Sequence, residues 1–272
     1  MKTIGIISIK GGVGKTSAVG AIGASLANDY GKKVLLVDAN FSAPNLGLQL
    51  GLYSPEVTIH HVLDDKINIK DAIYETGYGF DILPGAQSYR KLNPLKLAEK
   101  LREAKKKYDI ILIDSSPNLN EEILSTMIAS DELLVMTTPD HVTLNATMKA
   151  IKIARDKRTP ITGIVLNKVH NKNFEISIED IENATGTNVL AVLPHEIEVL
   201  EALSESKPST MHKNSKSSLE YKKLAGCLIG EELKKSKWQK FMNLFSKSGV
   251  IPKQEVNREL FRNKRIENPF YK

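Results

Sequence analysis

The sequence predicts an α/β fold: a mostly parallel, twisted sheet of about seven to eight strands with helices on both faces. Short apolar runs recur along the chain, and most of them lack the alternation typical of strands that face water on one side. Helical patterns separate these runs, which indicates right-handed crossovers between parallel strands. With 272 residues, 41% of them hydrophobic, the chain can bury one substantial core.

The predicted elements alternate along the chain. Strands are expected at residues 3–9, 33–39, 80–85, 108–114, 132–138, 161–167 and 188–193. Helices are expected around residues 15–29, 59–64, 68–75, 94–107, 120–130, 142–157, 176–185, 196–204 and 218–235. Ligands of open parallel sheets bind beyond the carboxyl ends of the strands. The residues that follow each strand are therefore the candidate site residues.

The strand pattern stops after about Leu233, so residues 1–233 predict one domain. Residues 234–272 carry eight lysines and three arginines against three glutamates, a net charge of +8, whereas residues 1–233 sum to −2. The basic character belongs to the tail, and the main body shows no general nucleic-acid footprint. We expect a candidate amphipathic helix at 234–248 and a flexible basic tail at 249–272.

Cysteine content and hydropathy indicate the compartment. The single cysteine, Cys227, excludes an intrachain disulfide and fits a reducing cytosol. The N-terminal apolar run is too short for a signal peptide, and Lys10 interrupts it. No stretch approaches the ~18–20 apolar residues that span a bilayer. We therefore expect a cytoplasmic protein.

The stretch ISIKGGVGKTS, residues 7–17, is a candidate phosphate-binding loop, because it follows a predicted strand and opens a predicted helix. Its glycines let backbone N–H groups turn toward phosphate oxygens at the positive end of a helix. Lys15 is expected to reach the β- and γ-phosphates, Thr16 to bind Mg²⁺ and Ser17 to touch the α-phosphate. The predicted nucleotide contacts are Gly11, Gly12, Val13, Gly14, Lys15, Thr16 and Ser17.

Two acidic residues lie at or near the carboxyl ends of other predicted strands. Asp38 lies near the end of VLLVDAN, and Asp114 ends YDIILID. A phosphate-binding loop needs an acidic residue at a strand end to hold magnesium and its water shell. The sequence therefore predicts a P-loop NTPase fold that binds a nucleoside triphosphate with Mg²⁺, the metal being held by Thr16, Asp38 and Asp114.

Several further motifs occur in one order over about residues 1–233: KGGVGKTS, VDANFSAPNLGLQLGL, VTIHHVL, YDIILIDSSP, TTPDHVTL, VLNKV and LPHEIEVLEA. Together they resemble the MinD/ParA family of deviant Walker A ATPases and are most similar to its archaeal MinD-like members. A strict Walker A motif, GxxxxGK[ST], has glycine where this chain has Ile9, and the family tolerates various residues there.

The resemblance implies an ATP-dependent homodimer with ATP/ADP and Mg²⁺ as cofactors. The family's signature lysine matches Lys10, which would cross to the phosphates held by the partner subunit, while Lys15 is the ordinary P-loop lysine. Asn167 and Lys168 match the family's adenine contact, and the loop that begins at Pro194 would flank the base.

The chain departs from the family where other members read DxD and this chain reads Asp38, Ala39 and Asn40. The catalytic set implied by the resemblance is therefore Lys10, Lys15, Asp38 and Asn40. An Asn side chain can hydrogen-bond to a water but cannot accept its proton, and Ala146 replaces another acidic position. We expect slow hydrolysis and a long-lived ATP dimer. The alternative is that Asn40 is neutral, because the lysines and Mg²⁺ do most of the catalysis.

The tail contains an amphipathic pattern at helical spacing. Lysines Lys240 and Lys247 lie opposite an apolar arc formed by Trp238, Phe241, Met242 and Phe245. Aromatic residues on one face and lysines on the other suit a helix that lies in an anionic membrane surface. Packing onto the domain and binding of a partner or DNA remain open alternatives.

The expected function is an ATP-dependent dimerising switch that acts as a spatial regulator, for example of cell division or of motility or chemosensory positioning. It would attach reversibly to the inner face of the cell membrane and respond to a protein partner that stimulates hydrolysis. One alternative is a ParA-like partition ATPase on non-specific DNA, which the aromatic face disfavours. Another is an ATPase scaffold with very slow hydrolysis. An iron–sulfur cluster bridged across the dimer would need two cysteines per subunit, and Cys227 alone excludes it.

Overall fold

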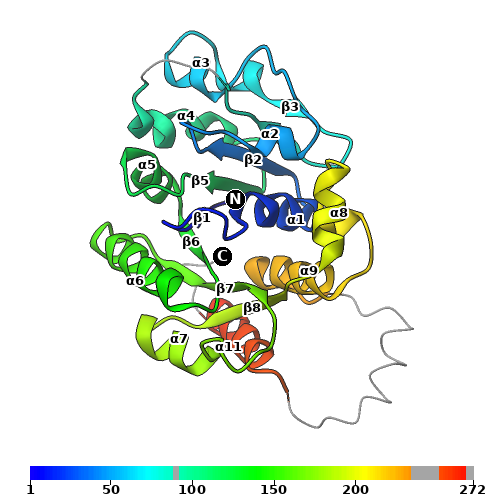
Figure 1. Ribbon diagram of the computed structural model, residues 1–272. Helices are drawn as coiled ribbons and strands as arrows, with labels where there is room; N and C mark the ends of the chain where they lie inside the picture. The colour runs from blue at the N-terminus through cyan, green and yellow to red at the C-terminus, as the bar shows by residue number, and fades with distance from the viewer. Residues whose placement is uncertain (88–91, 234–250, 268–272) are drawn as a thin grey trace.

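The computed structural model describes residues 1–87, 92–233 and 251–267, and it confirms the α/β fold. One eight-stranded sheet has the order β3-β4-β2-β5-β1-β6-β7-β8 (Figure 1). The strands are β1 Lys2–Ile7, β2 Val34–Ala39, β3 Tyr74–Glu75, β4 Asp81–Leu83, β5 Ile110–Ser115, β6 Glu132–Thr137, β7 Ile161–Val169 and β8 Val189–Pro194. All neighbouring pairs are parallel except β3 with β4.

Helices cover both faces of this sheet (Figure 1). They are α1 Lys15–Asn28, α2 Leu46–Gln49, α3 Ile59–Leu63, α4 Leu97–Ala104, α5 Glu121–Ala129, α6 His141–Asp156, α7 Ile178–Thr185, α8 Ile197–Ser204, α9 Lys216–Ile229 and α11 Lys253–Glu267. Three 3₁₀ turns lie at Ile69–Ala72, Pro94–Lys96 and Ser209–Met211. The short α2 and β3 were not predicted, and β3 occupies the end of the helix expected at 68–75.

Strand alternation divides the core into two sides. Leu36 of β2 and Leu112 of β5 belong to the apolar cluster under α1 and α9, whereas Leu35 and Ile111 point to the other face. Because side chains two residues apart share a face, Asp38 and Asp114 are directed to the α1 side. The fold thus aims both strand-end carboxylates at the helix that follows the phosphate loop.

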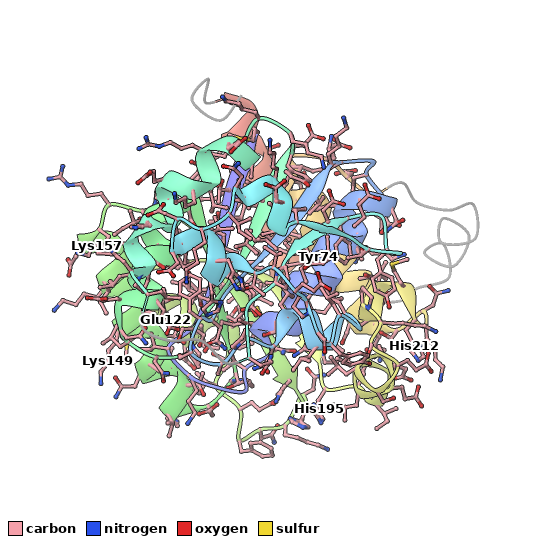
Figure 2. The ribbon with its side chains drawn as sticks, turned by 90° about the horizontal axis from the view of Figure 1, so that it is seen from above. Tyr74, Glu122, Lys149, Lys157, His195 and His212 are labelled. Atoms are coloured by element: carbon pink, nitrogen blue, oxygen red, sulfur yellow. The ribbon has the colours of Figure 1, made fainter. Side chains whose placement is uncertain are left out.

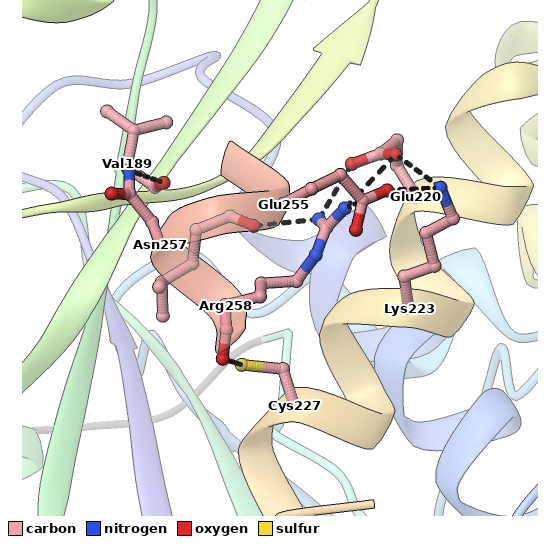
Figure 3. A network of polar contacts seen from close by, with 8 residues as sticks. Val189, Glu220, Lys223, Cys227, Glu255, Asn257 and Arg258 are labelled. Carbon is pink, nitrogen blue, oxygen red and sulfur yellow. Dashed lines mark hydrogen bonds and ion pairs between the residues drawn. The ribbon is translucent and has the colours of Figure 1, made fainter. Parts of the chain in front are cut away.

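The expectation of a flexible tail at 249–272 is wrong for residues 253–267, which form α11. Figure 3 shows how this helix docks: the Arg258 side chain is 1% exposed and donates to the carbonyl of Leu190 at 2.8 Å. Arg258 also pairs with Glu220 of α9 and with Glu255, both at 2.8 Å. Asn257 donates to the carbonyl of Val189 at 2.8 Å.

Polar groups therefore hold α11 on β8 and α9. The low apolar content of this segment suggested a flexible tail because it gave no sign of these polar contacts. The candidate amphipathic helix at 234–248 lies outside the described residues. Within the described part of the chain, no helix is both long and apolar enough to cross a membrane.

Candidate active site

A cleft of about 360 Å³ opens at the carboxyl ends of the central strands, a size typical of small-molecule sites. The phosphate loop forms one wall, and Asn40, Asn167, Lys168 and Pro194 form others. Residues predicted from four distant parts of the sequence are thus brought together. Val13, Asp38 and Asp114 lie behind this surface, buried to within 2% exposure.

The phosphate loop has the backbone geometry that its glycines allow. Gly12 and Gly14 have φ angles of 76° and 97°, in the left-handed region that side chains disfavour. A Cβ atom on Gly14 would also lie 2.4 Å from Nδ2 of Asn167. α1 begins directly after Gly14, so its free N–H groups and its positive dipole end face the cleft.

Lys15 lies in the wall of the cleft, 7% exposed. Burial lowers the pKa of its ammonium group, an effect that the charge of Asp114 opposes. A buried cation at a helix N-terminus is a strong anion-binding arrangement, because the anion replaces the water that the cation has lost. This geometry supports the predicted phosphate contact.

Asp38 and Asp114 lie side by side, in register on the neighbouring strands β2 and β5. Asp38 accepts hydrogen bonds from the backbone N–H groups of Leu46 at 3.0 Å and Asn40 at 3.2 Å. Burial and then the charge of Asp114 raise the pKa of Asp38 well above its usual range. Two buried carboxylates in contact favour a cation beside them, which would separate their charges.

Asp114 also reaches the phosphate loop. Its Oδ2 accepts a hydrogen bond from the Thr16 hydroxyl at 2.6 Å, while its Oδ1 has no partner among the described residues. Burial raises the pKa of Asp114 to about 6, against the effects of Thr16 and Lys15. A free carboxylate oxygen beside a hydroxyl fits a hard cation such as Mg²⁺. The residues present therefore fit Mg²⁺–ATP, which would supply the transferable phosphoryl group and a metal to neutralise its charge.

Asn40 is 8% exposed and lies between Asp38 and the cleft. Its Nδ2 donates to the carbonyl of Ala43 at 2.6 Å, and its Oδ1 has no partner among the described residues. A free amide oxygen can accept a hydrogen bond from water and so can orient it. It cannot take the proton of that water, so residue 40 offers the cleft a hydrogen-bond acceptor and no strong base.

The two lysines of the loop are placed differently. Lys15 lines the cleft, whereas Lys10 is exposed and does not belong to the residues that line it. The backbone N–H of Lys10 donates to the Ser8 hydroxyl at 3.2 Å, which shapes the start of the loop. The structure thus leaves the Lys10 side chain outside the cleft of its own subunit.

Asn167 and Lys168 lie near the carboxyl end of β7 and line the cleft. Asn167 donates to the carbonyl of Val13 at 2.8 Å, so it also ties β7 to the phosphate loop, which the sequence did not indicate. Pro194 ends β8, and its carbonyl accepts a hydrogen bond from the Ser217 hydroxyl at 3.0 Å.

Other cleft residues were missed. Gln49 of α2 accepts a hydrogen bond from Ser17 at 3.3 Å, and Tyr221 comes from α9. His195, which is labelled in Figure 2, also lines the cleft. Its ring centroid lies 5.0 Å from that of His170. Gln49 lies within a quoted motif, but no helix was predicted there, so its side chain could not be placed. His195 directly follows Pro194 in the quoted motif LPHEIEVLEA, but no role was assigned to it. Nothing in the local pattern pointed to Tyr221.

Comparison with known proteins supports this geometry. A family model described as an AAA domain matches residues 1–162, and one described as the NUBPL iron-transfer P-loop NTPase matches residues 97–229. The iron-transfer description has no counterpart in cysteine chemistry here, because Cys227 is buried beneath α11 and burial raises the pKa of its thiol to about 12.

Individual relatives cover nearly the whole chain. An uncharacterized ATP-binding protein of Methanocaldococcus jannaschii is 33% identical over 90% of this chain and 95% of its own length. The cell division ATPase MinD of Pyrococcus furiosus has a TM-score of 0.78 and 36% identity, covering 82% of this chain and 96% of its own. The septum site-determining protein MinD of Pyrococcus horikoshii, solved with Mg-ADP, has a TM-score of 0.78 and 31% identity, covering 91% and 99%. The chain belongs to the MinD/ParA family of P-loop ATPases.

Proposed function

We propose that this ATPase is a dimerising switch that attaches reversibly to a membrane surface and acts as a spatial regulator, for example of cell division. The placement of Lys10 carries this proposal. Its ammonium group is exposed beside a cleft that already contains Lys15. A second lysine in that position can serve a nucleotide bound by another copy of the chain, as an arginine finger does.

Within such a dimer, each residue has a defined task. Lys15 and the N-terminus of α1 hold the phosphates, and Thr16 with the Asp38–Asp114 pair holds Mg²⁺ and its water shell. Lys10 from the partner adds positive charge where it develops on the γ-phosphate. Asn40 orients the attacking water without deprotonating it, so hydrolysis is slow and the ATP dimer is long-lived.

Slow hydrolysis makes regulation by a partner effective. A protein that stimulates hydrolysis would shorten the lifetime of the dimer and so set where it persists. The names of the two Pyrococcus relatives refer to cell division and the septum site. Cell division is therefore the first role to test, with motility or chemosensory positioning next.

Membrane attachment rests on the sequence of the tail, residues 234–248, which lie outside the described residues. A single amphipathic helix binds a membrane weakly, and two of them in one dimer bind far more tightly. Attachment would therefore follow ATP-driven dimerisation. The protein would be cytoplasmic and peripheral at the inner face of the membrane.

The test is co-sedimentation of the full-length chain with anionic vesicles in ATP and in ADP. We expect pelleting in ATP that is lost in ADP and in Trp238→Ala/Phe245→Ala. Full-length variants are preferable to a truncation at Leu233, because removing α11 would uncover β8 and the buried face of α9. The matched control is Tyr271→Ala, which changes an aromatic residue elsewhere in the tail. If ATP changes neither pelleting nor oligomeric mass, the switch model fails.

Two outcomes support the alternatives. ATP-dependent pelleting with DNA that falls steeply with salt and survives Trp238→Ala/Phe245→Ala indicates a ParA-like partition protein, and the +8 charge of residues 234–272 favours such contacts. A stable ATP dimer that binds neither surface and barely hydrolyses ATP indicates a structural or interaction scaffold.

A further inference from the structure

Residues 40–45, here called the β2–α2 segment, run along the cleft and are held by side chains from other elements. His60 of α3 contacts the carbonyl of Phe41 through Nε2 at 3.0 Å. Its Nδ1 accepts a hydrogen bond from the backbone N–H of Ala86 at 3.0 Å, so in the neutral ring Nε2 is the donor. Gln87 donates to the carbonyl of Pro44 at 2.7 Å. Side chains that lie outside the segment in the sequence thus fix the position of its backbone.

Glu122, in the first turn of α5, holds the same segment (Figure 2). Its carboxylate accepts a hydrogen bond from the Ser42 hydroxyl at 3.2 Å, and the residue is only 9% exposed. Burial of a carboxylate costs free energy, so this placement needs an explanation.

The N-terminus of α5 does not supply that explanation. Glu121 precedes Glu122 in the same helical turn and is exposed. Either carboxylate favours the positive end of the helix, and an exposed one does so at lower desolvation cost. Stabilisation of the helix therefore accounts for Glu121 and leaves the burial of Glu122 unexplained.

The contact between Glu122 and Ser42 joins the β2–α2 segment to the first turn of α5. Ser42 belongs to the chain that leaves β2 just after Asp38, and Glu122 to the chain that leaves β5 just after Asp114. Asn40 and Asn45 of the β2–α2 segment line the cleft. A shift of this segment would therefore move the Asn40 amide relative to the phosphates.

We propose that Glu122 is a positioning residue for ATP hydrolysis, which acts through Ser42 to fix the β2–α2 segment and with it Asn40. This inference deepens the hydrolysis step of the function proposed above and rests on it. Phosphoryl transfer depends mainly on positioning and electrostatics, so a small displacement of Asn40 slows the reaction. The phosphate loop is not involved, so nucleotide affinity is retained.

The test compares five full-length variants: Glu122→Ala, Ser42→Ala, the double variant, Glu122→Gln and the control Glu121→Ala. Glu122→Ala and Ser42→Ala should each lower kcat about tenfold or more, with KM within about twofold. The double variant should be no slower than Glu122→Ala, because both remove one contact. Glu122→Gln keeps an acceptor for Ser42 and should retain most of the rate, and Glu121→Ala should match the wild type.

Amide hydrogen exchange of residues 40–46 in the nucleotide-free protein provides a second readout. Exchange should be faster in Glu122→Ala and Ser42→Ala and unchanged in Glu121→Ala. A wild type that does not hydrolyse ATP would defeat the switch proposal, and the exchange data would still decide the role of Glu122.

A wild-type kcat in Glu122→Ala would overturn the inference, as would independent losses that add in the double variant or unchanged amide exchange. A loss in Glu122→Gln as large as in Glu122→Ala would also overturn it, because the charge and not the contact would then matter. If Glu122→Ala does not fold, Ser42→Ala and Glu122→Gln decide, because Ser42 is exposed.

Discussion

The buried charges beside the cleft and those under α11 are arranged in opposite ways. In the cleft, Asp38 and Asp114 are neighbours of like charge, and Asp114 keeps one oxygen without a partner among the described residues. At α11, Arg258 lies between Glu220 and Glu255, and its guanidinium also reaches the carbonyl of Leu190 (Figure 3). Lys223 adds a second cation, which pairs with both Glu220 and Glu255, so the chain itself neutralises this cluster. The pair Asp38 and Asp114 instead needs a ligand.

The difference shows that the pairing of a buried charge indicates whether it stabilises the fold or binds a ligand. A complete cluster, such as that of Arg258, holds elements together, and it loses stability when one member is removed. An incomplete cluster of like charges lowers the stability of the ligand-free fold. It also strengthens the binding of a cation, because the cation offsets the repulsion between the carboxylates. The same substitution, carboxylate to amide, should therefore change stability in opposite directions at the two places.

The largest effect is expected at α11. Arg258→Met removes the buried cation and leaves Glu220 and Glu255 with only the partly exposed Lys223, so it should lower the free energy of unfolding by about 3–5 kcal/mol. Urea denaturation measures this change. Arg262→Met is the control, because its partner Glu232 is 75% exposed and such a pair is worth about 1 kcal/mol at most. Equal losses in the two variants would show that the Arg258 cluster is not what docks α11.

Lys15→Met should weaken ATP binding by at least about thirtyfold, because a buried charge contact with phosphate is lost. Titration with a fluorescent ATP analogue measures the affinity. Lys10→Met should leave the affinity of the monomer unchanged and abolish the increase in mass that ATP produces. Equal weakening of binding by both substitutions would contradict the separate placement of the two lysines.

Asp114→Asn tests the incomplete cluster. Removing one of two like charges should raise the stability of the ligand-free protein by about 1 kcal/mol and abolish the Mg²⁺ dependence of nucleotide binding. Glu220→Gln makes the same chemical change at α11 and should lower stability. Thermal unfolding with and without Mg²⁺–ADP measures these effects. A stability change of the same sign in both variants would contradict the contrast between the clusters.

The smallest effect is expected for Asn40→Asp, which adds a proton acceptor beside the cleft. Hydrolysis should become about three- to tenfold faster, a modest gain because lysine and metal contributions dominate the rate. Single-turnover hydrolysis with the partner lysine intact measures it. If the rate does not rise, slow hydrolysis has another cause, and Asn40 is neutral.

Much of the site could be predicted because its signals are local. GGVGKTS contains its own turn residues and its own helix start, and the strand pattern placed Asp38 and Asp114 at the edge where ligands bind. Asn167 was found through a motif, but its hydrogen bond to Val13 joins residues 154 positions apart, so no local pattern could indicate it. The same holds for Glu122, whose partner Ser42 lies 80 residues away.

The sequence by itself determined the parallel sheet, the phosphate loop and the family, because periodicity, glycine chemistry and motif order are properties of short stretches. Only the tertiary structure decided that residues 253–267 dock as α11, because Arg258 and Asn257 are unfavourable in a core until Glu220, Leu190 and Val189 surround them. It also decided that Lys10 lies outside its own cleft while Lys15 lies within it. Burial and pairing depend on neighbours that are far apart along the chain, so composition alone could not reveal them.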